Sequence, residues 1–195
     1  MRSSLAVLLT VALSAFAAPA GDVTIQACSS VTVYFARGTS EPGLIGNRVG
    51  PQFQDALRSA LGSKSLEFVG IDYPATVAGF LAGGDAGGAT TMANSVTAKA
   101  NSCPSTKIVI SGYSQGAQVA HLAAGKLTAA IQNRVNAAVV FGDPKNGQAF
   151  AGVISGRSKT FCHAGDFICT GGVLVTAAHT NYDQVRVLSL DLHVV

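Results

Sequence analysis

Short apolar runs alternate with amphipathic stretches along most of the chain. Apolar runs bounded by polar residues or glycine predict buried strands, and apolar side chains recurring every three or four residues predict helices packed on a sheet. The predicted strands are 31–36, 66–72, 107–111, 135–141 and 159–162, and the predicted helices are 51–61, 89–100 and 115–131. Because strands and helices alternate and no linker or repeat divides the chain, the pattern predicts one α/β domain with a mostly parallel sheet flanked by helices.

The two ends of the chain depart from this pattern. Residues 1–20 combine Arg2, an apolar run and small residues near Ala17 and Ala20, which is typical of a secretory signal peptide cleaved near one of those alanines. The run is shorter than the roughly 20 residues that a membrane-spanning helix needs. We therefore expect residues 21–195 to form a secreted domain with no integral membrane association. Residues 183–195 alternate in the manner of a strand with nothing after them, and this atypical tail has no obvious place in the domain.

Composition and charge narrow the class of protein. The 195 residues include 13 Lys and Arg against 10 Asp and Glu, and 48% of them are hydrophobic. So apolar a chain is not expected to be disordered. The basic residues are scattered rather than gathered into a stripe that could follow phosphates, which argues against a nucleic-acid partner.

Four cysteines in an oxidising compartment are expected to pair, and four allow three connectivities. Cys162 and Cys169 are seven residues apart within one loop, which leaves Cys28 and Cys103 for a long link. A metal site is the alternative, but no Cys-x-x-Cys or His-x-x-x-His spacing accompanies the cysteines. We therefore expect two disulfides, and neither a metal nor a cofactor.

Candidate chemistry lies between the strand predicted at 107–111 and the helix that follows. Residues 112–116 read Gly-Tyr-Ser-Gln-Gly, a G-x-S-x-G motif. A nucleophilic serine in this motif stands on a sharp turn, and glycines two before and two after it remove side chains that would collide there. The N–H of Gln115, at the start of the helix, lies where an oxyanion would develop. Ser114 is therefore the candidate nucleophile.

The candidate acid is one of two aspartates. In hydrolases of this architecture the acid follows the second strand after the nucleophile's strand, which favours Asp166 over Asp143. Asp143 is interpreted instead as a turn residue before Pro144. Asp166 lies inside the proposed Cys162–Cys169 loop, where a disulfide would hold its carboxylate in place.

A serine hydroxyl also needs a base, and the chain offers His121, His163, His179 and His193. The chain order of serine, acid and histidine excludes His121 and His163 when the acid is Asp166. His121 is interpreted as a surface or packing residue of its helix. His193 lies in the atypical tail, which leaves His179 as the candidate base.

These residues resemble the signature blocks of the cutinases, a family of secreted serine esterases found chiefly in fungi. The resemblance covers roughly residues 28–182 and rests on Phe35-Ala36-Arg37-Gly38-Thr39, Cys103-Pro104, the G-x-S-x-G block, Phe161-Cys162, Gly165-Asp166, Cys169-Thr170-Gly171 and His179. It implies a lidless α/β-hydrolase of three layers, α/β/α, with both cysteine pairs as disulfides. It also implies Ser114, Asp166 and His179 as the triad, and Thr39 as an oxyanion-hole residue beside Gln115.

Two apolar segments are predicted to flank the triad on loops and to bind substrate. One is 77–81, which contains Phe80 and Leu81, and the other is Val173, Leu174 and Val175. Ordinary core packing is the alternative for both. The glycine-rich stretch 82–88 is interpreted as a mobile loop at the same crevice, because no Gly-Lys-Ser/Thr follows to make it a phosphate cradle.

The expected function is hydrolysis of carboxylic esters through an acyl-enzyme, by a protein that we expect to be a monomer. An apolar rim would suit cutin or other aliphatic polyesters, and short- and medium-chain acyl esters. An acetylxylan esterase is the nearest alternative, although the chain has no Trp to stack on sugar rings. A secreted binding protein with an inactive site is an alternative of another class, and the atypical tail is the only feature that supports it.

Overall fold

The structure is a computed structural model that describes residues 28–182. The predictions for the leader, 1–20, and for the tail, 183–195, lie outside these residues. Both predicted disulfides are present, and they join Cys28 to Cys103 and Cys162 to Cys169.

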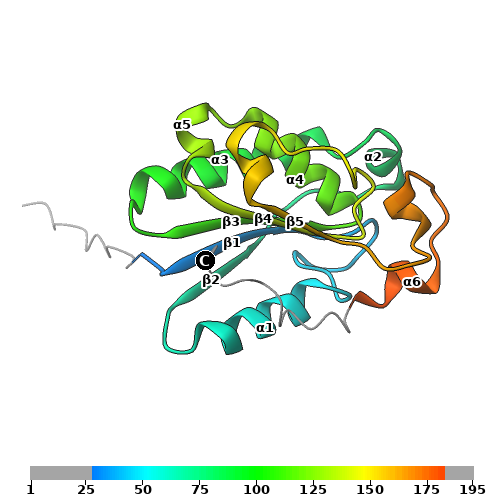
Figure 1. Cartoon of the computed structure of the whole chain (residues 1–195), viewed down its shortest axis with the longest axis horizontal. Helices are drawn as coiled ribbons and strands as arrows, with labels where there is room; N and C mark the ends of the chain where they lie inside the picture. Colours follow the sequence, from blue (N-terminus) through cyan, green and yellow to red (C-terminus); the bar gives the residue numbers. More distant parts are fainter. Residues whose placement is uncertain (1–27, 183–195) are drawn as a thin grey trace, which may run out of the picture.

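A parallel five-stranded sheet forms the middle of the molecule (Figure 1). Its strands are β1 (Val31–Ala36), β2 (Leu66–Gly70), β3 (Lys107–Tyr113), β4 (Val135–Phe141) and β5 (Ser158–Phe161), in the order β2-β1-β3-β4-β5. The inner strands β1, β3 and β4 are apolar and buried on both faces, as strands covered by helices must be. The edge strands β2 and β5 are partly exposed.

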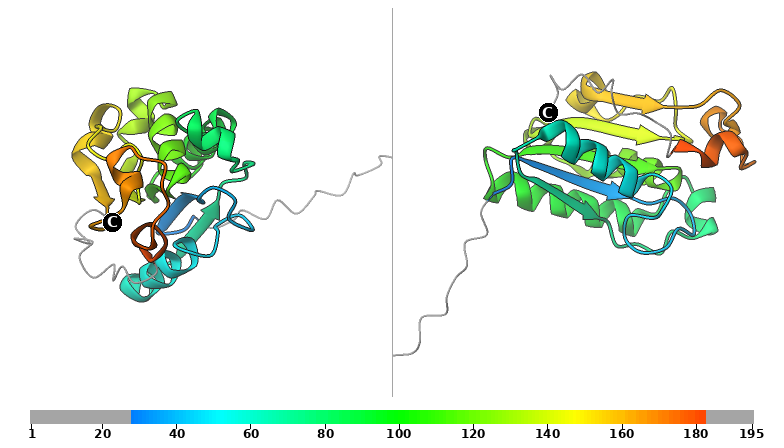
Figure 2. Two further views of the ribbon diagram at one scale, coloured as in Figure 1. Left: turned by 90° about the vertical axis from the view of Figure 1, so that its right-hand side faces the viewer. Right: turned by 90° about the horizontal axis from the view of Figure 1, so that it is seen from below.

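Helices cover both faces of the sheet unequally. On one face lie α3 (Ala86–Ser102), α4 (Gln115–Lys126) and α5 (Ala129–Gln132), and on the other lies α1 (Gly50–Leu61), as Figures 1 and 2 show. Each layer has its own buried core, and Phe53 and Leu57 of α1 pack against Phe35 and Phe141 in the smaller one. The three-layer α/β/α fold predicted from the sequence is confirmed.

Four short elements remain, of which three gather at the carboxyl end of the strands and the fourth, residues 152–157, leads into the amino end of β5. They are α2 (Val77–Leu81), α6 (Ala177–Thr180) and the 3₁₀ helices η1 (Gly152–Arg157) and η2 (Phe167–Thr170). Of these, α2, η2 and α6 project beyond the sheet at one end of the molecule (Figure 2). Ligands of open parallel sheets bind at this end, so these elements surround the natural place for a site.

Two predicted helix boundaries are wrong because capping side chains override the apolar period. The helix predicted at 115–131 is two helices: Leu127 is extended, and the Thr128 side chain caps α5 by accepting from the N–H of Ile131. The glycine-rich stretch 82–88 is not all loop. Asp85 accepts from the N–H of Gly88 (2.7 Å) and starts α3 at Ala86, so the second half of the stretch is helical.

Candidate active site

Ser114 stands on a strained turn between β3 and α4. Its backbone has φ 56° and ψ −120°, a left-handed conformation that costs a residue with a side chain of the order of 1–3 kcal/mol. A Cβ atom on Gly112 would collide with the backbone of Gly116, and one on Gly116 would collide with the carbonyl of Ala36. Both glycines of the G-x-S-x-G motif are therefore required by the close approach of strand and helix.

The structure brings Ser114, His179 and Asp166 into one line. Nε2 of His179 lies 3.0 Å from Oγ of Ser114, and its Nδ1 lies 2.8 Å from Oδ2 of Asp166. The histidine and the aspartate are each 2% exposed, and the serine is 7% exposed. The arrangement can move a proton from the serine hydroxyl to the imidazole while a buried carboxylate holds the opposite edge of the ring.

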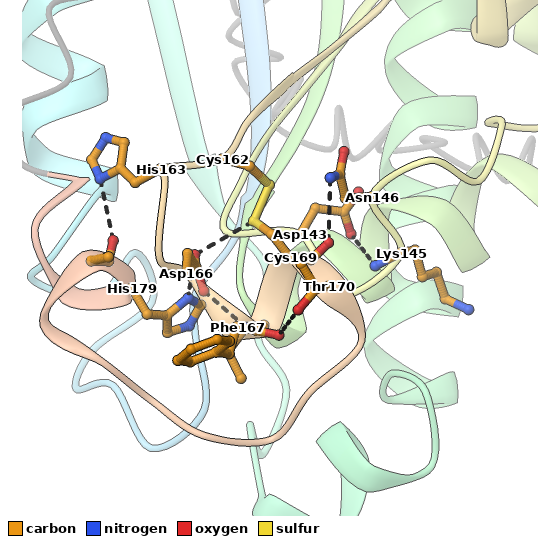
Figure 3. The surroundings of a disulfide bond; sticks show 12 residues. Asp143, Lys145, Asn146, Cys162, His163, Asp166, Phe167, Cys169, Thr170 and His179 are labelled. Atoms are coloured by element: carbon orange, nitrogen blue, oxygen red, sulfur yellow. Dashed lines mark hydrogen bonds and ion pairs between the residues drawn. A yellow bond between two sulfur atoms is a disulfide. The ribbon is translucent and has the colours of Figure 1, made fainter.

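The short disulfide closes the loop that carries Asp166 (Figure 3). Within this loop Oδ1 of Asp166 accepts from the N–H of Ile168 (2.9 Å). Its Oδ2 accepts a further hydrogen bond from the hydroxyl of Tyr182 (2.7 Å). Sequence reasoning missed Tyr182, and the only local signal for it is an aromatic residue three positions after His179.

Tyr113, the first x of the G-x-S-x-G motif, holds His179 in place through its hydroxyl and its ring. Its hydroxyl donates to the carbonyl of His179 (2.7 Å), and its ring stacks on the imidazole with centroids 5.1 Å apart. Burial raises the pKa of Tyr113, so the hydroxyl stays a donor over the range in which enzymes work. Sequence reasoning did not single out this residue.

Thr39 and Gln115 lie together beside the serine. Nε2 of Gln115 donates to Oγ1 of Thr39 (2.8 Å) and to the carbonyl of Thr76 (2.8 Å). Because Oγ1 of Thr39 accepts this bond, its own hydroxyl hydrogen is free for another acceptor. Thr39 and Ser114 line the same cleft, and the N–H of Gln115 is at the N-terminus of α4. The pair can therefore supply donors to a developing oxyanion.

A buried carboxylate that the sequence analysis missed fixes the loop after β1. Glu41 accepts from the backbone N–H of Gly38 (2.6 Å), and from those of Asn47 and Arg48 (both 3.0 Å). These three bonds fold the segment that carries Thr39 back on itself. The acid's place two residues after Thr39, in an uncharged stretch, was the available signal.

An open cleft of about 290 Å³ leads to Ser114. Its apolar lining comes from both predicted segments and consists of Val77, Phe80, Leu81, Val173 and Val175, with Ile168. The exposed fractions of Val77 (59%), Leu81 (66%), Val173 (68%) and Val175 (59%) exclude core packing for these four. Leu174 is exposed too, but it is not part of the lining.

The position of the first apolar segment differs in one respect from the prediction. Residues 77–81 form the helix α2 rather than a loop, because the Thr76 side chain accepts from the N–H of Gly79 (3.0 Å) and caps it. The side-chain amide of Gln118 then donates to the carbonyl of Phe80 (3.3 Å) and ties α2 to α4. The second segment, 173–175, has no regular structure.

The other histidines of the described residues have partners away from Ser114. Nε2 of His121 lies 3.0 Å from Oδ2 of Asp143, so this aspartate does more than start a turn. The ring of His163 stacks on Tyr182 with centroids 4.1 Å apart. His193 falls outside the described residues. Within 28–182, no three His, Cys, Asp or Glu side chains gather as metal ligands, and no helix is long and apolar enough to cross a membrane.

Comparison with known proteins shows that this chain is similar to cutinases in sequence and in structure. The Cutinase family model matches residues 27–189. A cutinase of Botryotinia fuckeliana is 54% identical over 89% of this chain and 86% of its own, and one of Monilinia fructicola is 50% identical over 90% and 87%. A Trichoderma reesei cutinase in complex with a C11Y4 phosphonate inhibitor has a TM-score of 0.76 and 45% identity, covering 80% of this chain and 71% of its own.

An acetyl xylan esterase is a more distant structural neighbour. It has a TM-score of 0.65 and 26% identity, covering 80% of this chain and 92% of its own. The family model, by contrast, spans all the described residues, and the two cutinase relatives are about half identical to this chain. The chain therefore belongs to the cutinase family of carboxylic ester hydrolases.

Proposed function

We propose that this protein is a secreted serine esterase that hydrolyses cutin or other aliphatic polyesters, and short- and medium-chain acyl esters. The observation that carries the proposal is the line of hydrogen-bonding atoms from Oγ of Ser114 through His179 to Asp166, with spacings of 3.0 and 2.8 Å. Ser114 and His179 line an open, largely apolar cleft. The cutinase relatives support the substrate class.

The first half of the reaction forms an acyl-enzyme. Oγ of Ser114 attacks the ester carbonyl carbon as Nε2 of His179 takes its proton. Asp166 accepts a hydrogen bond from Nδ1–H and stabilises the imidazolium. The oxyanion accepts from the N–H of Gln115, and from the N–H and hydroxyl of Thr39. His179 then gives its proton to the leaving alkoxide oxygen, and the C–O bond to the alcohol breaks.

The second half repeats these steps with water. His179 takes a proton from a water molecule that attacks the acyl carbon, and the same donors hold the second oxyanion. The bond to Oγ of Ser114 breaks, Oγ regains its proton from the imidazolium, and the carboxylic acid leaves. The scheme uses the ester, one water molecule and the side chains and backbone groups named above.

The apolar walls favour an aliphatic acyl chain over a sugar ester. Val77 and Leu81 on one side and Val173 and Val175 on the other expose more than half of their side chains beside an uncovered serine. Each methylene of substrate that they bury should contribute up to about 0.8 kcal/mol until the groove ends. Butyrate to octanoate esters should therefore have a higher kcat/KM than acetate esters.

Labelling with a fluorophosphonate probe tests the nucleophile. Ser114→Ala and His179→Ala should each lose labelling and hydrolysis almost completely, because nucleophile and base act as one unit. His121→Ala is the matched control, because it also breaks a buried histidine–aspartate pair; it should lose stability but keep the label. A protein whose Ser114 stays unlabelled would be the inactive binding protein. If His193→Ala inactivated the enzyme and His179→Ala did not, the base would be His193 instead of His179.

Comparison of hydrolysis rates on different substrates tests the proposed substrate class. The purified enzyme should release soluble products from an aliphatic polyester film. Leu81→Ser with Val173→Ser should slow this about thirtyfold, because each exposed side chain contributes roughly 1 kcal/mol on contact with an apolar surface. Val153→Ser is the matched control, because Val153 is exposed but lies outside the cleft lining. Faster release of acetate from acetylated xylan than cleavage of a butyrate ester would favour an acetylxylan esterase.

We also infer that residues 1–20 are a leader removed near Ala17 or Ala20, and that the mature protein acts outside the cell as a monomer. The two disulfides support an oxidising compartment. Mass spectrometry of the protein secreted into culture medium should give an N-terminus close to one of these alanines, and size-exclusion chromatography should give the mass of one chain. Retention of Met1 in the secreted protein would contradict this inference.

A further inference from the structure

Among the described residues that follow His179, Tyr182 is the one that hydrogen-bonds to a side chain of the triad. It is 2% exposed, and its hydroxyl donates to Oδ2 of Asp166 (2.7 Å) while accepting from the N–H of His163 (3.0 Å). The backbone N–H can only donate, so the hydroxyl hydrogen is directed at the carboxylate. Burial, reinforced by the carboxylate of Asp166, raises the pKa of Tyr182 and keeps that hydrogen in place.

The hydroxyl shares its acceptor atom with the catalytic histidine. Oδ2 of Asp166 takes both the Tyr182 hydroxyl and Nδ1 of His179, and Oδ1 takes the N–H of Ile168. With both oxygens engaged, the carboxylate cannot rotate away from the imidazole. A second donor on Oδ2 also withdraws charge from the oxygen that stabilises the imidazolium. Tyr182 therefore acts on the orientation and on the basicity of this carboxylate.

We propose that Tyr182 is a positioning residue for ester hydrolysis, which holds the Asp166 carboxylate in line with His179 and limits how strongly it stabilises the imidazolium. This inference rests on the proposed function. Tyr182 does not touch the reacting atoms, and its hydroxyl acts through Asp166.

The groups that face Tyr182 are few. Its ring lies against those of Phe141, His163, His179 and Tyr113, with centroids 4.1 to 6.4 Å away. Sγ of Cys169 in the short disulfide lies 3.7 Å from its hydroxyl. Asp166 is the only carboxylate bonded to Tyr182 among residues 28–182. His163 is a further titratable side chain against Tyr182, and its ring stacks on that of the tyrosine.

Tyr182→Phe is the direct test, with kcat and KM measured on a soluble butyrate ester from pH 5 to 9. We expect about a tenfold fall in kcat with little change in KM, because a hydrogen bond to a charged group is lost. We also expect the acid limb of the profile to move to higher pH by roughly half a unit, because the carboxylate then stabilises the imidazolium more strongly. A purely structural role would lower kcat without moving this limb.

Tyr113→Phe is the matched control. It also removes a buried hydroxyl that anchors the histidine, but this hydroxyl bonds to the carbonyl of His179 rather than to the carboxylate. Its acid limb should therefore stay at the wild-type position. Equal movement of the limb in both variants, or no movement in Tyr182→Phe, would overturn the proposal. Far-ultraviolet circular dichroism and thermal unfolding establish whether each variant is folded.

Site-specific replacement of Tyr182 by 3-fluorotyrosine decides the question even if Tyr182→Phe fails to fold. The fluorinated phenol is more acidic and a stronger donor, so the acid limb should move to lower pH, opposite to the phenylalanine variant. An unchanged limb would overturn the proposal. If the wild type hydrolyses the ester and both Tyr182 variants have the same acid limb as the wild type, the esterase function stands and only the role of Tyr182 is refuted. A wild-type protein without esterase activity would overturn both.

Discussion

Removing the two disulfides one at a time should separate stability from turnover. The Cys162–Cys169 bridge spans 7 residues and the Cys28–Cys103 bridge spans 75. On the loop-closure account of chain entropy, these spans correspond to about 2.4 and about 4.5 kcal/mol of stabilisation. The double variant Cys28→Ser with Cys103→Ser should therefore lose more free energy of unfolding than the double variant Cys162→Ser with Cys169→Ser.

Turnover should show the opposite order. The short bridge closes the loop that carries Asp166, whose Oδ2 must stay 2.8 Å from Nδ1 of His179. The long bridge joins the start of β1 to the end of α3, at the end of the sheet opposite Ser114. We expect the short-bridge variant to lose kcat by about tenfold or more, since small misplacements of a catalytic group are costly. The long-bridge variant should keep the kcat of the wild type.

The assay needs both quantities from the same samples. Urea unfolding followed by circular dichroism gives the free energy of unfolding. Titration with a fluorophosphonate gives the concentration of active sites, by which the measured rate is divided to give kcat. The reasoning would be refuted if the two variants had equal kcat per active site. It would also be refuted if the short-bridge variant were the less stable one by more than the error of the extrapolation.

Three further outcomes are expected at Glu41, Ser114 and Glu67. Glu41→Gln loses an acceptor for one of three backbone N–H groups, and should lower the free energy of unfolding by about 2 kcal/mol and reduce kcat, measured by urea unfolding and ester hydrolysis. Ser114→Gly and Ser114→Ala should both be inactive, but the glycine variant should be more stable by about 1 kcal/mol because Ser114 has φ 56°. Burial opposes the charge of Glu67, but hydrogen bonds from Lys99 and Thr32 outweigh it and lower the pKa of that carboxyl. Its stabilisation is then present above the ordinary carboxyl pKa and lost below it, so the stability difference between wild type and Glu67→Gln should shrink as pH falls below about 4.

The strands buried on both faces could be predicted from the sequence closely. An inner strand of a parallel sheet is a continuous apolar run with sharp polar borders, and the predictions 31–36 and 135–141 coincide with β1 and β4. The helix ends could not be placed in this way. The apolar period runs on past Leu127, and only the cap formed by Thr128 interrupts the helix there.

The candidate triad could be predicted because a motif and a chain order constrain it, whereas its supporting residues could not. Ser114 has a local signature, and Asp166 and His179 follow from their order along the chain. Glu41 bonds to backbone N–H groups, which every residue but proline offers, so its place after Thr39 in the sequence does not reveal these partners. Tyr182 bonds to a residue 16 positions earlier, and that contact exists only once the chain has folded.

A buried histidine–aspartate pair does not by itself identify the catalytic base. His121 and Asp143 lie 3.0 Å apart and are nearly as well buried as the pair of His179 and Asp166, which lie 2.8 Å apart. Yet His121 is seven residues beyond Ser114 on α4, a rise of about 10 Å, and its ring stacks on Phe150 instead of facing the serine. Proximity to the strained turn distinguishes the two pairs. A helix that begins at the nucleophile carries its own histidines away from it, so the base has to come from a later loop that returns to the carboxyl end of the sheet.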